Sequence, residues 1–259
     1  MIDCEAIEKS IISSLKKRKA PQKTLAAVLV GSDSASLSFL KQKKAVAEEL
    51  GVRFELIKLS AALSQGALED KVRKISRRNN VGGVIVQLPL PKKFDRVPVL
   101  NAIGISKDID VLNGENSKVL APAAGALERI LKKIKFKAEG KKLVVVGSGI
   151  LIGEPAVKWL MKRAKKLTVF NKGGIDRKTL KQADLIVSGT GVAGLIGGKD
   201  IKRGAVVVDF GYGKKNGVLM GDIDFKSASK KTDKITPVPG GTGPIVVAIL
   251  LQNFFTLNE

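Results

Sequence analysis

The stretch Lys142-Leu-Val-Val-Val-Gly-Ser-Gly-Ile-Leu-Ile-Gly153 decides the fold of this 259-residue chain. It opens with a short apolar, β-branched run, which is typical of a buried strand. Three glycines follow within seven residues, and residues 154–165 have the pattern of a helix. A strand, a glycine-rich turn and a helix, in that order, place a dinucleotide phosphate at a helix N-terminus. The stretch therefore predicts an α/β domain with a dinucleotide-binding loop.

Strands and helices alternate on both sides of this stretch. We predict strands at 24–30, 52–59, 82–87, 142–146, 167–170, 185–187 and 205–209, and helices at 34–50, 65–79, 122–133, 154–165 and 245–255. Such alternation produces right-handed βαβ units and mainly parallel sheets. The predicted fold is α/β, with two lobes and an active-site cleft between them. Residues 1–121, completed by a C-terminal helix at 243–259, form the catalytic lobe, and residues 122–242 form a Rossmann-type lobe.

The composition excludes several kinds of chemistry. The chain has no histidine, which removes every catalytic pair that uses one and the usual metal ligand, so we expect no metal site. Cys4 is the single cysteine, so no intrachain disulfide can form, as in a reducing cytoplasm. No apolar run is long enough to span a bilayer, and the sequence begins without the pattern of a signal peptide.

The chain is strongly basic, with 46 Lys and Arg against 24 Asp and Glu, a net charge of +22. Such a field attracts nucleic acid or anionic small molecules. The basic residues are scattered in short clusters, and one Trp and one Tyr are the only large amphipathic rings for stacking. A general surface property is favoured, and phosphorylated cofactors would benefit from it. A nucleic-acid-binding protein on this scaffold is the alternative, which predicts steeply salt-dependent binding.

Two motifs in the first half carry candidate chemistry. Ser36, Phe39 and Lys43 are spaced i, i+3 and i+7, so they share one face of the predicted helix. A lysine on a helix is usually a solvated charge, so the spacing alone does not make Lys43 a catalytic residue. Gln87 closes a strongly apolar strand just before Leu88 and Pro89, so it lies at the carboxyl edge of a sheet, where ligands bind.

Residues 235–244, Ile-Thr-Pro-Val-Pro-Gly-Gly-Thr-Gly-Pro, form a second loop with unusual chemistry. Proline fixes the backbone, and glycine lets another molecule approach it closely. The loop leads directly into an apolar helix, whose first N–H groups are free for a ligand.

Together these motifs resemble the methylenetetrahydrofolate dehydrogenase/cyclohydrolase family. The resemblance rests on Val86-Gln-Leu-Pro-Leu-Pro91, Lys107-Asp-Ile-Asp110, the Gly147–Gly153 loop and Pro239-Gly-Gly-Thr-Gly-Pro244, which occur in the family's order. It implies oxidation of 5,10-methylenetetrahydrofolate with NADP or NAD, then hydrolysis of the methenyl product to 10-formyltetrahydrofolate. It also implies a cytoplasmic homodimer that binds a folate.

The resemblance assigns roles to individual residues. The implied catalytic residues are Lys43, Gln87, Asp110 and Ser36, with Lys43 managing protons and Asp110 holding the pterin. The implied folate contacts are Phe39, Lys43, Val86, Gln87, Leu88, Asp110, Pro239, Gly240, Gly241 and Gly243. The implied cofactor contacts are Gly147, Ser148, Gly149, Gly153, Lys172, Gly191 and Tyr212.

Several positions depart from the family pattern. Phe39 replaces a tyrosine, and Ala121 replaces a cysteine near the active site. Ser148 replaces an arginine that holds the 2′-phosphate of NADP, with Lys172 as a possible substitute. Val111 replaces a glycine, and Thr242 replaces a valine. These departures leave two alternatives to the bifunctional enzyme open: mainly a cyclohydrolase, or an NAD-dependent dehydrogenase.

Overall fold

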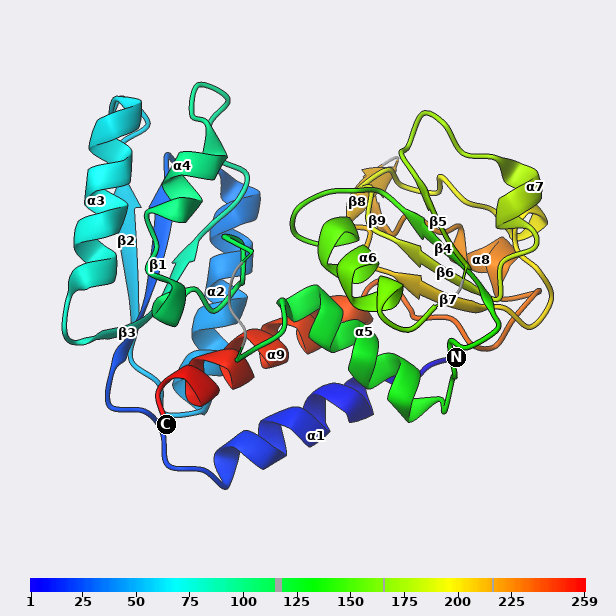
Figure 1. The fold of residues 1–259 in the computed structure, drawn as a ribbon, viewed down its shortest axis with the longest axis horizontal. Helices are drawn as coiled ribbons and strands as arrows, with labels where there is room; N and C mark the ends of the chain where they lie inside the picture. Colours follow the sequence, from blue (N-terminus) through cyan, green and yellow to red (C-terminus); the bar gives the residue numbers. More distant parts are fainter. Residues whose placement is uncertain (115–117, 165, 216) are drawn as a thin grey trace. The chain divides into compact units, whose positions relative to one another are not determined.

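A computed structural model describes residues 1–114, 118–164, 166–215 and 217–259 (Figure 1). The chain divides into two compact units. Residues 10–122 and 247–259 form one unit, and residues 1–9 and 123–246 form the other. We call them the three-stranded unit and the four-stranded unit, after their parallel sheets. Helices α1 (Cys4–Lys16) and α9 (Thr242–Leu257) each pass from one unit into the other.

The sheet of the three-stranded unit has the order β2-β1-β3, and all its strands are parallel. The strands are β1 (Thr24–Val30), β2 (Phe54–Leu59) and β3 (Val81–Val86), connected through α2 (Ser34–Glu49) and α3 (Gln65–Arg77). Every residue of β1 and β3 is buried, which explains why both are continuously apolar. From β1 the chain moves to one neighbour and then back past β1 to the other. Right-handed connections therefore place α2 and α3 on opposite faces.

Helix α9 packs closely on β3 because two glycines lie beneath it. A Cβ at Gly83 would come within 2.8 Å of the Phe254 ring, and one at Gly82 would overlap Asn258. Asn253 donates hydrogen bonds from Nδ2 to the carbonyl oxygens of Ile109 at 2.9 Å and Leu120 at 2.8 Å. The C-terminal helix therefore stabilises the loop that follows η1 (Ile105–Lys107). The short helix α4 (Arg96–Asn101) precedes η1.

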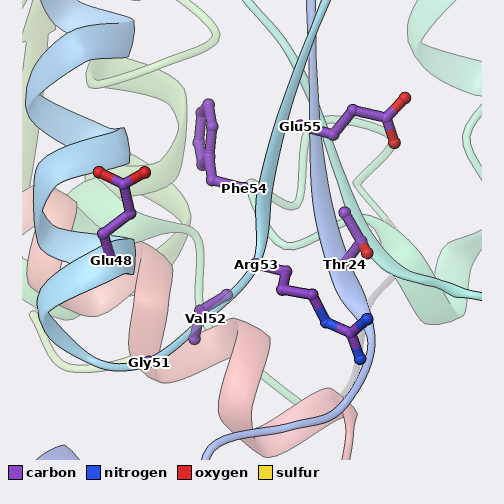
Figure 2. A pocket seen from close by; sticks show the side chains of 7 residues that line it. All are labelled: Thr24, Glu48, Gly51, Val52, Arg53, Phe54 and Glu55. Carbon is purple, nitrogen blue, oxygen red and sulfur yellow. The ribbon is translucent and has the colours of Figure 1, made fainter.

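An open hollow of about 540 Å³ lies at the amino-terminal edge of this sheet (Figure 2). Its lining residues are Thr24, Glu48, Gly51, Val52, Arg53, Phe54 and Glu55. Arg53 donates to the carbonyl oxygen of Gln22 at 2.5 Å, and Glu55 forms a bidentate pair with Arg78 at 2.9 and 3.0 Å. The charged groups of the hollow thus already have partners within the protein.

The sheet of the four-stranded unit has the order β5-β4-β6-β7 and is also parallel. Its strands are β4 (Lys142–Val146), β5 (Lys166–Phe170), β6 (Leu185–Ser188) and β7 (Val206–Asp209). The helices are α5 (Pro122–Lys133), α6 (Gly153–Met161), α7 (Arg177–Leu180), η2 (Gly198–Asp200) and α8 (Phe225–Ala228). Two short strands, β8 (Gly213–Lys215) and β9 (Val218–Met220), pair as an antiparallel hairpin.

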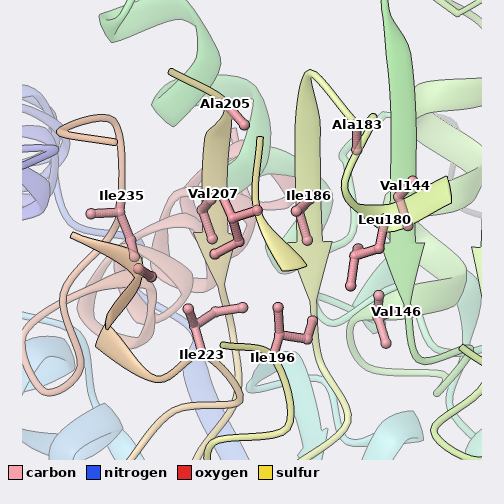
Figure 3. Close-up of a cluster of buried hydrophobic side chains, with 12 residues drawn as sticks. Val144, Val146, Leu180, Ala183, Ile186, Ile196, Ala205, Val207, Ile223 and Ile235 are labelled. Atoms are coloured by element: carbon pink, nitrogen blue, oxygen red, sulfur yellow. The ribbon is translucent and has the colours of Figure 1, made fainter. Parts of the chain in front are cut away.

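The core of the four-stranded unit is built from aliphatic side chains that alternate along its strands (Figure 3). Val144, Ile186 and Val207 come from three neighbouring strands, and each is 1% exposed or less. Ile235 pairs with Val207 as an isolated parallel bridge, and its carbonyl oxygen accepts from the Ile2 N–H at 3.0 Å. These contacts explain why the first residues of the chain belong to this unit.

The predicted α/β class with a Rossmann-type domain is confirmed. The predicted bounds of β1, β4 and α5 agree with the structure. Helix α6 ends at Met161, four residues before the predicted end, and the last of those residues, Lys165, lies outside the described ones. The sequence patterns missed α1, α4, α7, α8 and the β8–β9 hairpin. No helix in the described ranges is both long enough and apolar enough to cross a membrane.

Candidate active site

Lys43 and Gln87 meet at the carboxyl edge of the three-stranded sheet. Lys43 Nζ, from α2, donates to Gln87 Oε1, just beyond β3, at 3.2 Å. Gln87 is 9% exposed, its N–H continues the ladder to the Val28 carbonyl oxygen, and its Nε2 donates to the Leu88 carbonyl oxygen at 2.7 Å. The connection that leaves β1 leads to β2 on one side, and the connection that enters β3 crosses the opposite face of the sheet. The boundary between β1 and β3 is therefore the topological switch point, where α/β sheets bind ligands. The structure thus brings the predicted lysine and glutamine together.

Asp110 adds a carboxyl group to this pair. Burial raises the pKa of Asp110, while the positive charge of Lys43 acts in the opposite direction, so the two groups interact electrostatically. The Asp110 side chain nevertheless retains some exposed surface. A lysine, an amide and a carboxyl that share one sheet edge can exchange protons with a polar ligand and hold it by hydrogen bonds.

Asp108, to which the sequence analysis assigns no role, precedes Asp110 by two residues and forms an isolated parallel bridge with Val84 of β3. It is fully buried, and its Oδ2 accepts from the Asn113 N–H at 3.0 Å. Among the described residues its Oδ1 has no hydrogen-bond partner. Burial, with a contribution from the charge of Asp110, raises its pKa to about 6, although the backbone N–H groups of the following turn oppose the shift. Asp108 therefore organises the turn that carries Asp110.

That turn contains an unusual backbone conformation at Val111. Its φ is +56°, a left-handed value that a β-branched side chain rarely adopts. The resemblance expects a glycine here, and glycine is the residue that this conformation favours. The backbone of this turn is therefore strained at Val111, the residue that follows Asp110.

Ser36 and Phe39 lie on the same helix as Lys43, but Ser36 has a structural partner. Asp33 is the N-cap of α2, and its Oδ2 accepts from the Ser36 N–H at 2.7 Å. The Ser36 backbone and side chain both hold the pKa of Asp33 below its usual range. Ser36 is 2% exposed, whereas Phe39 is partly exposed. An aspartate directly before the first helical residue is a preferred N-cap, and it accepts from the N–H three residues later. The sequence analysis did not identify Asp33 in this role.

The glycine-rich loop follows β4 in the four-stranded unit, again at a switch point, between β4 and β6. Gly147 has φ of +99°, and a Cβ there would come within 2.8 Å of the Gly189 carbonyl oxygen. A Cβ at Gly153, the first residue of α6, would overlap the Gly147 carbonyl. A Cβ at Gly149 would meet no described atom within 4 Å. The first and third glycines thus permit close packing, and the middle one leaves the backbone open.

This loop fits the diphosphate of a dinucleotide. Ile152 is the N-cap of helix α6, and in the described chain no side chain caps this N-terminus. The Glu154 N–H donates to the Gly149 carbonyl oxygen at 3.0 Å and Pro155 has no N–H, so an anion here is favoured chiefly by the positive end of the helix. The nine residues of α6 are enough for two turns of helix.

Ser148 points to the end of β5. Its Oγ donates to Asn171 Oδ1 at 2.7 Å, and the next residue, Lys172, is exposed. An acid at the end of the second strand binds the ribose 2′-hydroxyl in NAD enzymes. Here the first three residues after β5 are Asn171, Lys172 and Gly173, so that position carries an amide and a cation.

Gly191 and Tyr212 lie on neighbouring loops after β6 and β7. Gly191 has φ of +71°, and a Cβ there would be 4.0 Å from the Tyr212 carbonyl oxygen. Tyr212 is 52% exposed. The structure therefore brings the loops that carry Gly147, Gly191 and Tyr212 to one edge of the four-stranded sheet.

Two buried carboxylates, which the sequence reading left without a role, support these loops. Asp209 accepts from the N–H groups of Gly211 at 2.7 Å, Asp222 at 3.2 Å and Ile223 at 3.0 Å. Asp222 Oδ2 accepts from Ser188 Oγ at 2.7 Å and from the Thr190 N–H at 2.6 Å. Burial, with a contribution from the charge of Asp222, raises the pKa of Asp209 to about 7, although the backbone N–H groups oppose the shift. The pair therefore holds the backbone at Thr190 and Gly211, which directly precede Gly191 and Tyr212.

The loop at 237–243 is tied to the same pair. Thr242, at the start of α9, donates from Oγ1 to the Asp209 carbonyl oxygen at 2.9 Å. A Cβ at Gly241 would overlap the Pro237 carbonyl, whereas Gly240, with φ of +79°, and Gly243 face open space among the described atoms. Pro239, Gly240 and Gly243 are the accessible part of the predicted folate-binding loop.

Groups of three or more potential metal ligands do not occur among the described residues. The sole cysteine, Cys4, is buried, and burial raises its pKa to about 12.

A parallel sheet with a glycine-rich loop of the dinucleotide-binding type, in a chain that has a second α/β unit with a lysine-containing site, is typical of dinucleotide-dependent enzymes of two domains. Family models agree with both halves. Residues 2–110 match the tetrahydrofolate dehydrogenase/cyclohydrolase catalytic domain, and residues 121–259 match the NAD(P)-binding domain of the same family. The chain belongs to this family.

Individual relatives cover nearly the whole chain. The bifunctional protein FolD of Clostridium tetani is 34% identical over 239 residues, 88% of this chain and 86% of its own. The structure of the bifunctional FolD of Campylobacter jejuni has a TM-score of 0.91 at 31% identity, covering 99% of this chain and 97% of its own. The Trypanosoma brucei FolD, whose structure contains NADP and an inhibitor, has a TM-score of 0.90 at 30% identity, covering 99% and 96%.

Proposed function

We propose that this chain oxidises 5,10-methylenetetrahydrofolate with NADP and hydrolyses the methenyl product, with Lys43 as the proton-transfer group of the hydrolysis. Membership of the bifunctional dehydrogenase/cyclohydrolase family supports both activities. The observation that carries the role of Lys43 is its hydrogen bond to Gln87, together with its electrostatic interaction with Asp110.

In the hydrolysis, water attacks the methenyl carbon. A group must take one of its protons and deliver it to the leaving ring nitrogen, while the other proton is released to solvent as the formyl C=O forms. Lys43 is suited to this transfer, because the chain has no histidine and Lys43 lies at the switch point. Gln87 is buried and fixed by the Leu88 carbonyl, so it can orient Nζ. Asp110 would accept hydrogen bonds from the amino edge of the pterin. Phe39, Val86 and Leu88 would provide the apolar contacts, and Ser36 supports the start of the helix.

In the oxidation, the bound nicotinamide accepts a hydride from the one-carbon bridge. The protein's task is to bind and orient the reactants. Gly147, Gly149 and Gly153 would hold the diphosphate, and the backbone around Gly191 and Tyr212 would contact the nicotinamide half. NADP is favoured over NAD because the end of β5 offers the exposed Lys172, where an NAD enzyme offers an acid. Pro239, Gly240, Gly241 and Gly243 would line the folate side.

Replacing Lys43 with methionine tests this assignment. Methionine keeps most of the side-chain length and removes the proton-carrying amine. The expected result is loss of methenyl-folate hydrolysis by at least a hundredfold, since general acid–base groups contribute roughly that factor or more. Methenyl-folate absorbance follows the reaction directly. Lys41→Met is the matched control, because Lys41 lies on the same helix and is exposed.

Hydrolysis at the wild-type rate in Lys43→Met, with the circular dichroism unchanged, would remove Lys43 from the mechanism. Phe39→Tyr provides a second test of the site. If Phe39 stacks on the folate as proposed, tyrosine preserves the ring and activity does not fall. A large loss of activity would contradict the proposed contact.

Cofactor choice is tested by titrating NADP and NAD separately with the folate substrate. A lower KM for NADP supports the role of Lys172, and Lys172→Gln should reduce that preference. Equal KM values in the wild type would contradict the proposal. We also propose that the enzyme is a cytoplasmic homodimer, which sedimentation of the full chain tests directly.

A further inference from the structure

A second hollow, of about 320 Å³, lies in the four-stranded unit at the amino-terminal edge of the sheet. Val206, the first residue of β7, is at its floor, and Lys141 directly precedes β4. The glycine-rich loop and Gly191 lie at the carboxyl edge of the same sheet. The hollow is therefore separate from the dinucleotide site.

Four lysines line this hollow: Lys135, Lys137, Lys141 and Lys234. All four are exposed, and within the described parts of the chain none forms an ion pair. Glu139 and Asp233 occur in the same two segments but do not line the hollow. Four ammonium groups around one concave space create a local positive field that an anion would relieve.

The remaining lining residues are apolar: Ile134, Phe136 and Val206. Phe136 is partly exposed, so its ring offers an apolar surface beside the charges. Ligand pockets combine such an apolar lining with a few polar groups, and roughly 300 Å³ is the lower end of their usual size. The hollow is thus suited to a small molecule with an anionic part and an apolar or planar part.

The backbone at Lys135 gives a separate indication. Helix α5 ends in a Schellman motif, in which the Phe136 N–H donates to the Leu131 carbonyl at 2.9 Å and the Lys135 N–H to the Lys132 carbonyl at 3.1 Å. Lys135 occupies the left-handed position of this motif, with φ of +53°. Glycine is the usual residue there, so a lysine carries a conformational cost. An outlier of this kind points to a role for the side chain.

We propose that this hollow binds a nucleoside triphosphate, with its phosphates on the four lysines and its base against Phe136. The triphosphate carries about as much negative charge as the four ammonium groups carry positive charge. Lysines act as point charges for phosphate, without the planar geometry that selects carboxylates. A nucleic-acid surface would instead require a basic groove with several stacking rings, whereas Phe136 is the single ring of this hollow.

Isothermal titration of ATP into the full chain tests this proposal. The titration is done with saturating NADP and repeated with saturating NAD, so that the dinucleotide loop is occupied. One ATP should bind per chain, more tightly than inorganic triphosphate, because the base adds the contact with Phe136. Lys137→Gln/Lys234→Gln should weaken ATP binding at least tenfold. Lys71→Gln/Lys74→Gln, on exposed positions of α3, removes the same charge and should change it less than twofold.

Lys135→Gly separates binding from folding. Glycine suits the left-handed position, so the melting temperature should not fall, while ATP binding weakens. The proposal is overturned if ATP does not bind the wild type, if inorganic triphosphate binds as tightly, or if the α3 control weakens binding equally. A short single-stranded RNA that binds more tightly than ATP, and loses affinity in the same variants, would overturn it in favour of nucleic acid.

Discussion

Replacing Asp209 with asparagine removes one carboxyl of the buried pair that supports the cofactor loops. Asp209 is 2% exposed, and burial raises its pKa from 3.8 to about 7. The folded state therefore keeps its proton to a higher pH than the unfolded state. The free energy of unfolding falls as pH rises through this interval, by about 4 kcal/mol in total, since each pKa unit corresponds to about 1.4 kcal/mol.

Asparagine cannot ionise, so Asp209→Asn should flatten this pH dependence between about pH 4 and pH 7. The variant also loses the acceptor for the Ile223 N–H, which lowers stability by about 1–3 kcal/mol at every pH. The slope against pH, not the absolute stability, is therefore the informative quantity.

Urea unfolding followed by tryptophan fluorescence measures this slope in the four-stranded unit, which contains Asp209. Trp159 is the only tryptophan of the chain and lies in α6, in the same unit as Asp209. Asp184→Asn is the control. Burial raises the pKa of Asp184, but hydrogen bonds from Lys202 and Lys142 outweigh it, and the net shift is downward. Its stabilising contribution is lost as pH falls, so its removal should change the profile only below about pH 4.

Parallel profiles for the wild type and Asp209→Asn from about pH 4 to pH 7 would refute this reasoning. They would mean that Asp209 is ionised throughout, with its three N–H donors compensating for burial. A flattened profile would instead show that the pair holds a proton at neutral pH.

Three further substitutions test other parts of the structure. Val111→Gly should raise stability by about 1 kcal/mol, measured by thermal unfolding with circular dichroism, because it relieves a left-handed valine at some entropic cost. Thr242→Val should lower stability by about 1 kcal/mol in urea titrations, because the hydrogen bond to the Asp209 carbonyl is lost. Ser148→Arg should raise the ratio of kcat/KM for NADP over NAD at least tenfold, since a guanidinium binds the 2′-phosphate; an unchanged ratio would contradict the proposed location of that phosphate.

The order of strands and helices could be predicted because buried parallel strands are continuously apolar. β1 and β4 are such runs, and each is followed by a turn and a helix. The carboxyl-edge positions of Gln87 and Gly147 followed from that order alone. Short elements such as α7 and α8, of four residues each, span barely one helical turn, so no periodic pattern repeats within them and they could not be recognised.

The supporting carboxylates could not be predicted, because their role depends on partners distant in sequence. Asp222 binds Ser188 and the Thr190 N–H, more than 30 residues away. Asp33 is different: its role as a cap is local, and an aspartate three residues before Ser36 is a sufficient signal.

The departures from the family pattern do not all weaken the site. Thr242 replaces an expected valine, yet its hydroxyl binds the Asp209 carbonyl and so ties the 237–243 loop to the carboxylate pair. Val111 replaces an expected glycine, yet the backbone keeps the left-handed conformation that glycine favours. The turn that carries Asp110 is therefore determined by its surroundings, chiefly the buried Asp108 carboxylate that accepts from the Asn113 N–H. Replacing Val111 with glycine should consequently change stability more than the folate KM, whereas Asp108→Ala should change both.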